Sequence, residues 1–435
     1  MAKAPQTKKA AKPAIKTATP KNNWEIKDRT YILLSDLSPI TYTISSRHTY
    51  KYPLLWFDET TNQQRELRYA TNQTSPFVDE QKGEATLGHI IFRNGTLTVP
   101  KAQQNLQKLL SLYHPLKDKK YKEFPDFILK ITEQIWENKD VESIGEFYTN
   151  NIPVRSPFGV TYGNKPVIEA TYSTLKEFPN RQLLGEDVIW NGNDEIGYHS
   201  SHRILSKGTH LGKGFYGEPT GKDIYYRVIA DCACKNNQVY DEWIVRDQGA
   251  MVRQIGYSPE EFARKMIEKE GGVSNSSKLY DANSDKNSDY KAESYKDGSI
   301  AEKYTQVLSN IFNKSYEYED YDRAANLFWP GNKLGHGRED IIEKWNSIKK
   351  IFTNIKFSIE HVGFLEEPEK NSRVSVRWFL EGEHANESDE YGKASNKKIF
   401  IMGINHAEFN NNSIIREWVL FDEVAIWKQI LLNHG

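Results

Sequence analysis

One segment of this chain occurs twice, and that repeat limits the folds open to it. Residues 241–254 read DEWIVRDQGAMVRQ and residues 416–429 read REWVLFDEVAIWKQ. Residues 201–210, SHRILSKGTH, align in the same way with residues 375–384, SVRWFLEGEH. The matching segments are separated by nearly the same number of residues and fall in separate elements. They therefore indicate two copies of one fold, in which one loop differs in length by one residue.

The pattern of apolar residues predicts what each copy contains. Residues 117–272 begin with FPDFILKITEQIWENKD, whose apolar residues share one helical face, and a second helix is expected after the turn at 163–166. Strand-like runs follow, at 183–190, 196–207, 222–235 and 239–253. Helices followed by an antiparallel meander predict an α+β fold, with the helices on one face of a curved antiparallel sheet.

A linker separates the copies. Residues 273–299 are rich in Ser, Asn, Asp and Lys and have little to bury, so they are expected to be flexible. The same order of helices and strands then starts again and fills residues 300–435.

The N-terminal part has a different composition. Residues 1–23 form a tail rich in Lys, Pro and Ala without an acidic residue before Glu25, and they are expected to be disordered. Weak polyanion contact and a solubilising role are both open for this tail. Residues 24–116 predict a small β-rich module, with a hairpin around Asn94-Gly95 and a helix after Pro100. No catalytic group of residues is visible in this module.

Charge and hydropathy exclude several classes of protein. A net charge of −1 gives no bulk attraction to nucleic acid or to an anionic membrane. The apolar runs are too short to span a bilayer, the mean hydropathy is −0.71, and no apolar signal segment begins the chain. Cys232 and Cys234 are the only cysteines, and no Cys or His cluster has zinc spacing. We therefore expect a soluble cytoplasmic protein without metal or cofactor.

Residues 117–272 resemble a known family. The resemblance is carried by IWENKDVESIGEFY, EFPNRQLLGEDVIW, SSHRILSKGTHLGKGFYGEPTG and ADCACKNNQVYDEWIVRDQGAMVRQIG. These segments resemble SnoaL-like proteins, the polyketide-cyclase branch of the nuclear-transport-factor-2-like superfamily, and residues 300–435 look like a diverged second copy. The resemblance implies two cone-shaped domains with a ligand cavity at the wide end. Residues 24–116 resemble small proteins of tailed-bacteriophage genomes, which implies a virion or assembly role.

The repeated strand carries the first candidate for chemistry. With a two-residue turn at Asn236-Asn237, Trp243, Val245 and Asp247 share the more apolar face, which is expected to point into the cavity. A carboxylate in an apolar cavity has a raised pKa and suits general acid–base catalysis. The resemblance implies that Asp247 is the acid/base of an intramolecular aldol closure. An Asp tied to an Arg or to a backbone amide, holding the strand end, is the structural alternative.

Further candidates surround that strand. His202 or His210 would orient a substrate oxygen or share a proton, although His210 also fits a purely structural role in its loop. Arg203 is a candidate for substrate binding, but an Arg beside an inward-facing Asp247 would lower the pKa of that carboxyl group and argue against its acid/base role. The remaining candidates are Trp190 and Trp243 as cavity-lining residues, Asp231 with its counterpart His406 if a β-bulge brings them to the face of Asp247, and Asp422 in the second copy.

Two functions are consistent with these residues. The first is a cavity protein that binds a small hydrophobic carbonyl compound and performs cofactor-free acid–base chemistry of the aldol cyclase or isomerase type. The alternative is a non-catalytic ligand-binding or assembly protein, since this fold is widely reused. The second copy departs from the family in its loops and is expected to have lost activity or to take another ligand. Sheet pairing is expected within the chain or between chains.

Overall fold

The structure, a computed structural model, describes residues 121, 123–281, 284, 295–313, 318–367 and 370–432, and short strands between residues 26 and 97. The chain forms two compact units, residues 1–113 and 114–435. The tail 1–23 and the helix expected after Pro100 lie outside the described residues.

The first unit contains a four-stranded antiparallel sheet in the order β3-β4-β5-β6. Its strands are β3 (Phe77–Asp79), β4 (Glu84–Leu87), β5 (Ile90–Arg93) and β6 (Thr96–Leu97), and a separate pair is formed by β1 (Ile26–Lys27) and β2 (Thr30–Tyr31). Arg93 opposes Thr96 across Asn94-Gly95, so the predicted hairpin is present.

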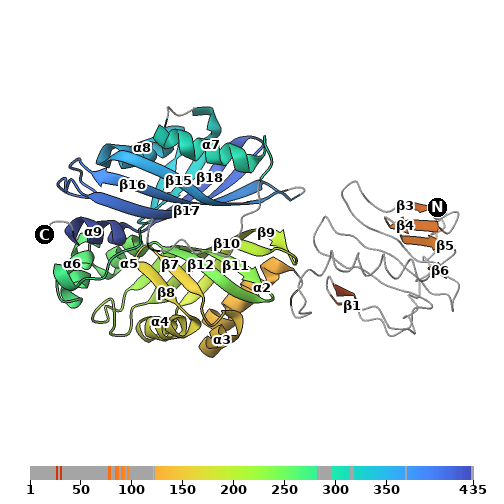
Figure 1. Ribbon diagram of the computed structural model, residues 1–435, viewed down its shortest axis with the longest axis horizontal. Helices are drawn as coiled ribbons and strands as arrows, with labels where there is room; N and C mark the ends of the chain where they lie inside the picture. Colours follow the sequence, from red (N-terminus) through yellow and green to blue (C-terminus); the bar gives the residue numbers. More distant parts are fainter. Residues whose placement is uncertain are drawn as a thin grey trace, which may run out of the picture. The chain divides into compact units, whose positions relative to one another are not determined.

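The second unit contains two six-stranded sheets of identical topology (Figure 1). The first copy consists of α2 (Phe124–Thr132), η1 (Glu133–Glu137), η2 (Val141–Ser143), α3 (Ile144–Phe147), β7 (Pro153–Ser156), β8 (Gly159–Tyr162), α4 (Asn164–Glu177), β9 (Gln182–Asn193), β10 (Gly197–Thr209), β11 (Asp223–Lys235), β12 (Gln238–Arg246), α5 (Gln248–Ile255), α6 (Pro259–Lys269) and η3 (Val273–Asn275). Its strand order is β8-β7-β12-β11-β10-β9.

The second copy repeats this order. It consists of α7 (Ile300–Asn313), η4 (Tyr318–Asp320), β13 (Tyr321–Trp329), β14 (Lys333–His336), α8 (Gly337–Ile351), β15 (Phe352–Leu365), β16 (Ser372–His384), β17 (Lys398–Asn410), β18 (Ser413–Phe421) and α9 (Glu423–Leu432). The strand order β14-β13-β18-β17-β16-β15 matches the first sheet strand for strand. The predicted α+β fold with two cone-shaped copies is confirmed, but each sheet is mixed rather than antiparallel, because β7 pairs with β12 and β13 pairs with β18 in parallel.

Local sequence explains the turns that shape the sheets. Asn236 and Asn237 join β11 to β12 with φ angles of 53° and 61°, the left-handed conformation that a two-residue hairpin requires. The register of the two strands then shifts between Ala233 and Cys234, so a β-bulge is present. Because of that shift, Asp231 opposes Trp243 rather than Glu242.

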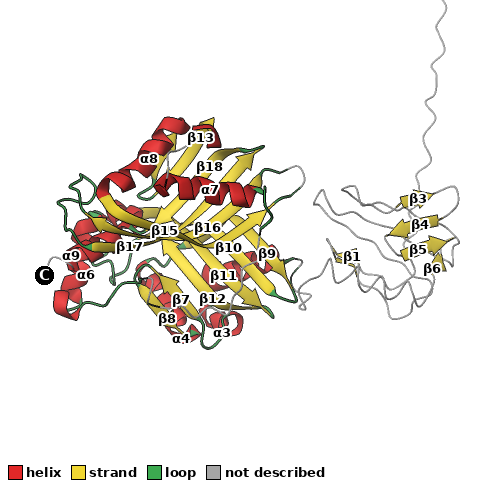
Figure 2. Ribbon diagram, turned by 45° about the horizontal axis from the view of Figure 1, so that its top comes forward, coloured by secondary structure: helices red, strands yellow, loops and turns green. Residues whose placement is uncertain are grey.

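Each sheet has two buried faces, and they serve different purposes. One face packs on the helices of its own copy, where Phe124 of α2 stacks on Tyr198 of β10. The other faces of the two sheets pack on each other, and the layers of strands lie between outer helices (Figure 2). The cluster between the sheets contains Ile229, Trp243, Val245, Tyr280, Phe379, Phe400, Met402, Ile404 and Leu420.

The position of Trp243 corrects one expectation. Trp243 and Val245 point toward the other sheet, whereas Glu242 and Ile244 point into their own cone. The predicted inward direction of the Trp243 face was wrong because both faces of β12 are covered, so the more apolar face is not the one that lines the cone.

Within the described part of the chain, no helix has both the length and the apolar character to cross a membrane.

Candidate functional site

The interior of the first cone contains a row of polar side chains on three neighbouring strands. Ser200 of β10 opposes Cys232 of β11, and Cys232 opposes Glu242 of β12. The next row on the same face is His202, Ala230 and Ile244. Alternation along each strand therefore places the carboxyl group of Glu242, the imidazole of His202, the hydroxyl of Ser200 and the thiol of Cys232 inside the cone.

Glu242 is the acid of this interior. It is 5% exposed, and burial is the main cause that raises the pKa of its carboxyl group, opposed by a hydrogen bond with the phenol of Tyr148. The atom Oε2 of Glu242 accepts no hydrogen bond from any described residue. A buried carboxylate oxygen without a protein donor normally faces a water molecule or a ligand.

His202 and Ser200 have the same property. Among the described residues, neither Nε2 of His202 nor Oγ of Ser200 has a hydrogen-bond partner, although both atoms are buried. Burial, with a smaller contribution from Arg203, lowers the pKa of His202 to about 4. The imidazole is therefore neutral near pH 7, where one ring nitrogen can donate a hydrogen bond and the other can accept one.

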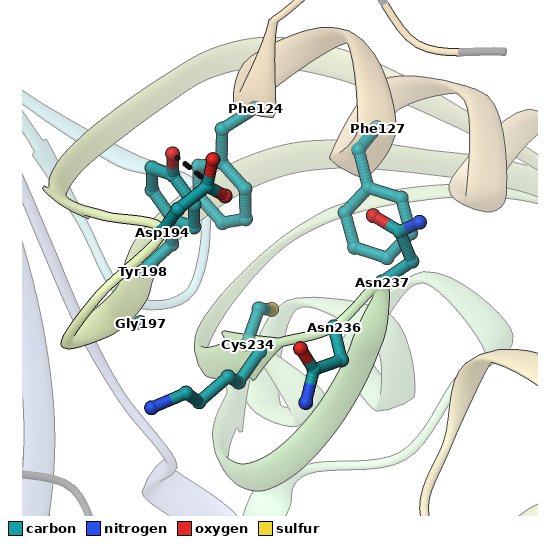
Figure 3. Close-up of a pocket in the computed structure, with 9 residues that line it drawn as sticks. Phe124, Phe127, Asp194, Gly197, Tyr198, Cys234, Asn236 and Asn237 are labelled. Carbon is teal, nitrogen blue, oxygen red and sulfur yellow. Dashed lines mark hydrogen bonds between the residues drawn. The ribbon is translucent and has the colours of Figure 1, made fainter. Parts of the chain in front are cut away.

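A pocket lies beside this row (Figure 3). It has about 390 Å³ of empty space, including open solvent, and is lined by Phe124, Phe127, Asp194, Gly197, Tyr198, Cys234, Lys235, Asn236 and Asn237. Tyr198 and Cys234 oppose each other on the interior face, two residues along each strand from Ser200 and Cys232. The pocket therefore adjoins the polar row between α2 and the turn of β11–β12.

The second cone differs in the environment of its acid. Glu417 corresponds to Glu242, and its carboxylate accepts hydrogen bonds from four side chains. The donors are Tyr304 Oη at 2.6 Å, Tyr321 Oη at 2.9 Å, Trp345 Nε1 at 3.3 Å and Asn405 Nδ2 at 3.5 Å. This carboxylate is fully satisfied by the protein, so it has no free lone pair directed at a ligand.

The second cone is also filled by larger side chains. Ile204 opposes Val228 in the first sheet, and Trp378 opposes Gly403 at the corresponding place in the second. The indole of Trp378 occupies the space above Gly403, since a Cβ at that glycine would meet Cζ2 at 2.1 Å. His202 is replaced by Val376, which is fully buried in the second core. The interior of the second cone is thus an aromatic core without the imidazole.

Asp247 lies at the end of β12, away from the polar row. It caps α5, where its Oδ1 accepts from Ala250 N at 2.9 Å. It also accepts from two amides of the β13–β14 turn in the second copy, Gly331 N at 2.9 Å and Asn332 N at 3.2 Å. Burial, followed by the charge of Glu423, raises its pKa to about 6. The geometry is that of the structural alternative, a carboxylate held by backbone amides.

Asp422 repeats this capping role. Its Oδ1 accepts from Val424 N at 2.8 Å and Ala425 N at 3.2 Å at the start of α9, and burial raises its pKa well above the ordinary value. The two aspartates of the repeated segment therefore end a strand and begin a helix in the same way.

Four other candidate residues lie between the two sheets, namely Arg203, Asp231, Trp243 and His406. Arg203 Nη1 donates to Nδ1 of His406 at 2.9 Å, and the guanidinium lies 3.6 Å from the ring centre of Trp418. Asp231 accepts from Ser201 at 2.5 Å, on the face that it shares with Trp243. The predicted bulge thus brings Asp231 to the face of Trp243, but this face is outside the cone. Arg203 pairs with Glu186 rather than with Asp247.

The remaining candidates lie in the first copy. Trp190 is half-buried on the interior face, with its ring centre 5.8 Å from that of Phe124, so it is near the pocket. His210 is buried in its loop, stacked on Phe178 with ring centres 5.1 Å apart and with Nδ1 3.2 Å from Thr220 Oγ1. Trp190 fits a lining role, and His210 fits a structural one.

Sequence reasoning missed Glu242, Tyr148 and Ser200. A signal for Glu242 was available, because the Glu before the Trp occurs in both copies of the repeated segment. Glu242 was overlooked because the opposite face of β12, which carries Trp243, was expected to line the cone.

Comparison with known proteins finds similar solved structures and one family. Among solved structures, AclR of Streptomyces galilaeus, a candidate hydroxylase, is 19% identical, with 30% of this chain and 78% of that chain covered and a TM-score of 0.27. IdmH of Streptomyces antibioticus, a candidate polyketide cyclase, is 17% identical, with 31% and 98% covered and a TM-score of 0.27. A candidate SnoaL-like polyketide cyclase from Jannaschia sp. is 16% identical, with 31% and 92% covered and a TM-score of 0.28. No curated protein matches the chain.

The sequence profile of the SnoaL-like polyketide cyclases matches two segments, residues 127–255 and 317–430. These segments are the two cones described above, and together they make up more than half of the chain. The chain therefore belongs to the SnoaL-like polyketide cyclase family and contains its domain twice.

Proposed function

We propose that the first domain binds a small, largely apolar carbonyl compound and moves a proton at the carbon next to the carbonyl group. The observation that carries this proposal is the interior of the first cone, where Glu242 keeps an oxygen without a protein donor. In the second cone the corresponding Glu417 is fully hydrogen-bonded. The second domain is then a filled copy that covers the outer face of the first sheet.

The proposed chemistry assigns separate tasks to the polar row. Glu242 as carboxylate takes the proton from carbon, and its raised pKa brings it closer to the pH at which it must accept and return that proton. Ser200 or neutral His202 donates a hydrogen bond to the carbonyl oxygen, where negative charge develops. The apolar surroundings of the row, among them Ile244 and Trp190, exclude water. This reaction belongs to the aldol cyclase and isomerase type and uses no cofactor.

The test measures proton exchange in a simple ketone. The full chain is incubated with 2-tetralone in D₂O, and the loss of the proton signal next to the carbonyl is followed by NMR. Glu242→Gln should lower the rate by a factor of about 10² or more, because general acid–base catalysis contributes about 10² to 10⁴. Asp247→Asn is the matched control, since Asp247 is a buried acid outside the row, and it should keep the rate within about threefold, below the effect of losing a general base.

Three results would contradict this proposal. A folded Glu242→Gln variant with unchanged exchange would remove Glu242 from the chemistry. Loss of exchange in Asp247→Asn alone would instead support Asp247 as the acid/base. A chain that binds 2-tetralone in saturation-transfer NMR without any exchange would support the non-catalytic ligand-binding function.

Location and the role of the N-terminal module are separate proposals. Composition and charge support a cytoplasmic protein, with nucleic acid contact confined to the basic tail. An assembly role for residues 24–116 is supported only by their resemblance to phage proteins, and it does not depend on the cone.

A further inference from the structure

The contact between the two sheets has a pseudo-twofold arrangement. On one side, Arg203 lies over Trp418 at 3.6 Å and contacts His406. On the other side, Arg377 lies over Trp243 at 3.7 Å and donates to Asp231 Oδ2 at 2.8 Å. Each arginine of one copy therefore stacks on the strand tryptophan of the other.

One pair of positions breaks this symmetry. Arg373 of β16 forms an ion pair with Asp187 of β9 on one side. The corresponding positions on the other side are His199 of β10 and His361 of β15, whose ring centres lie 3.6 Å apart with 35° between the ring planes. A charged pair has thus been replaced by two imidazoles, one from each domain.

A carboxylate completes this group. His199 Nε2 lies 3.8 Å from Asp231 Oδ2, and one donor atom from each of His199, Asp231 and His361 can be chosen so that all lie within 4.8 Å of one another. The three residues are between 0% and 3% exposed. This spacing is compatible with ligands around one ion, because bonds of about 2.0 to 2.2 Å separate tetrahedral ligands by roughly 3.3 to 3.6 Å.

We propose that His199, Asp231 and His361 bind one transition-metal ion that joins the two domains. Two imidazole nitrogens and one carboxylate oxygen favour Zn²⁺, Co²⁺ or Ni²⁺ over Mg²⁺ and Ca²⁺, which prefer oxygen ligands. This site is separate from the cone of the first domain and does not depend on the function proposed for it.

The surroundings of this group hold its carboxylate in place. Ser201 and Arg377 each hold one oxygen of Asp231 and so fix the orientation of that ligand.

Charge does not exclude a divalent ion. Arg377 is the nearest cation, but it is also influenced by the carboxylates of Asp241 and Glu360. Asp241 is in turn paired with Arg155. The charge of Arg377 is therefore partly offset by Asp231, Asp241 and Glu360, which reduces its repulsion of the ion. We expect an affinity below that of sites with several anionic ligands.

The experiment uses Co²⁺ as the probe because its visible spectrum reports the coordinating atoms. The full chain is stripped with a chelator and refolded from urea with Co²⁺, since the buried site opens only when the domains separate. We expect one Co²⁺ per chain with d–d bands in the visible region. The bands should be lost in His199→Asn and His361→Asn, whereas the control His336→Asn, an exposed imidazole hydrogen-bonded to Asn326, should keep them.

Two results would overturn the proposal. One is a folded wild-type chain that shows no Co²⁺ bands at several equivalents of metal. The other is a spectrum that persists when both His199 and His361 are replaced, which would place the ion elsewhere. If the variants fail to fold, X-ray absorption of the wild-type complex decides instead: two imidazoles and one oxygen ligand are expected, and fewer than two imidazoles would refute the site.

Discussion

Replacing Asp247 with Asn tests whether the folded chain raises the pKa of this buried carboxyl group. The folded chain holds the pKa of Asp247 at about 6, against an ordinary value of 3.8, because burial and the charge of Glu423 outweigh the three backbone amides. A raised carboxyl pKa means that the folded state binds the proton more tightly than the unfolded state. The contribution to stability is therefore present at low pH and lost as the pH rises from 3.8 through 6.

The magnitude follows from that interval. At about 1.4 kcal/mol per pH unit, the interval from 3.8 to about 6 corresponds to roughly 3 kcal/mol. Asn cannot titrate, so the difference in unfolding free energy between wild type and Asp247→Asn should shift by about 3 kcal/mol between pH 4 and pH 7, with the wild type losing relative stability.

Urea unfolding at a series of pH values measures this difference. Asp422→Asn is the matched variant, because Asp422 caps α9 as Asp247 caps α5 and has a pKa shifted in the same direction. A difference that does not change with pH, or one in which the wild type gains relative stability as the pH rises, would refute the burial of Asp247 as described.

Three further predictions concern the two cones and the contact between them. The folded chain lowers the pKa of His202 from 6.5 to about 4. The contribution of His202 to stability should therefore be complete above pH 6.5 and fall by up to about 3 kcal/mol as the pH drops to 4. Urea unfolding of His202→Asn should not show this loss. Ile204→Trp places an indole where the second cone has Trp378, so it should abolish 2-tetralone binding in saturation-transfer NMR. The larger side chain should also lower the unfolding free energy by about 1 to 3 kcal/mol. Retained binding would place the ligand outside the cone. Glu270→Ala removes the partner of Lys428, whose side chain is 3% exposed, and should lower the unfolding free energy by about 1 to 3 kcal/mol. An unchanged value would mean that the ammonium group of Lys428 is hydrated instead.

The repeated segment was enough to predict much of the fold. Two segments of equal pattern, each at the end of an antiparallel meander, predicted two copies with the same strand order, and both sheets have it. This worked because the alternation of side chains and the turn at Asn236-Asn237 are local properties of the chain.

The candidate site was only partly predictable. His202 and Trp190 lie on the interior face of the first cone, as expected of residues that line it. Glu242 was overlooked because β12 is buried on both faces, and a pattern of apolar residues does not identify which face lines the cone. The bulge at Ala233 and Cys234 decided the face of Asp231, and bulges depend on how neighbouring strands fit.

By itself, the sequence determined the family, the number of copies, the α+β class and the pairing of strands around short turns. Only the tertiary structure decided that the outer faces of the two sheets pack on each other, that Asp247 is held by amides of the second copy, and that His199 and His361 meet. The physical reason is that these contacts join residues more than 80 positions apart, through side chains whose direction depends on register and on what covers each face. Local patterns in a chain contain no information on which of two buried faces meets its own helices and which meets another sheet.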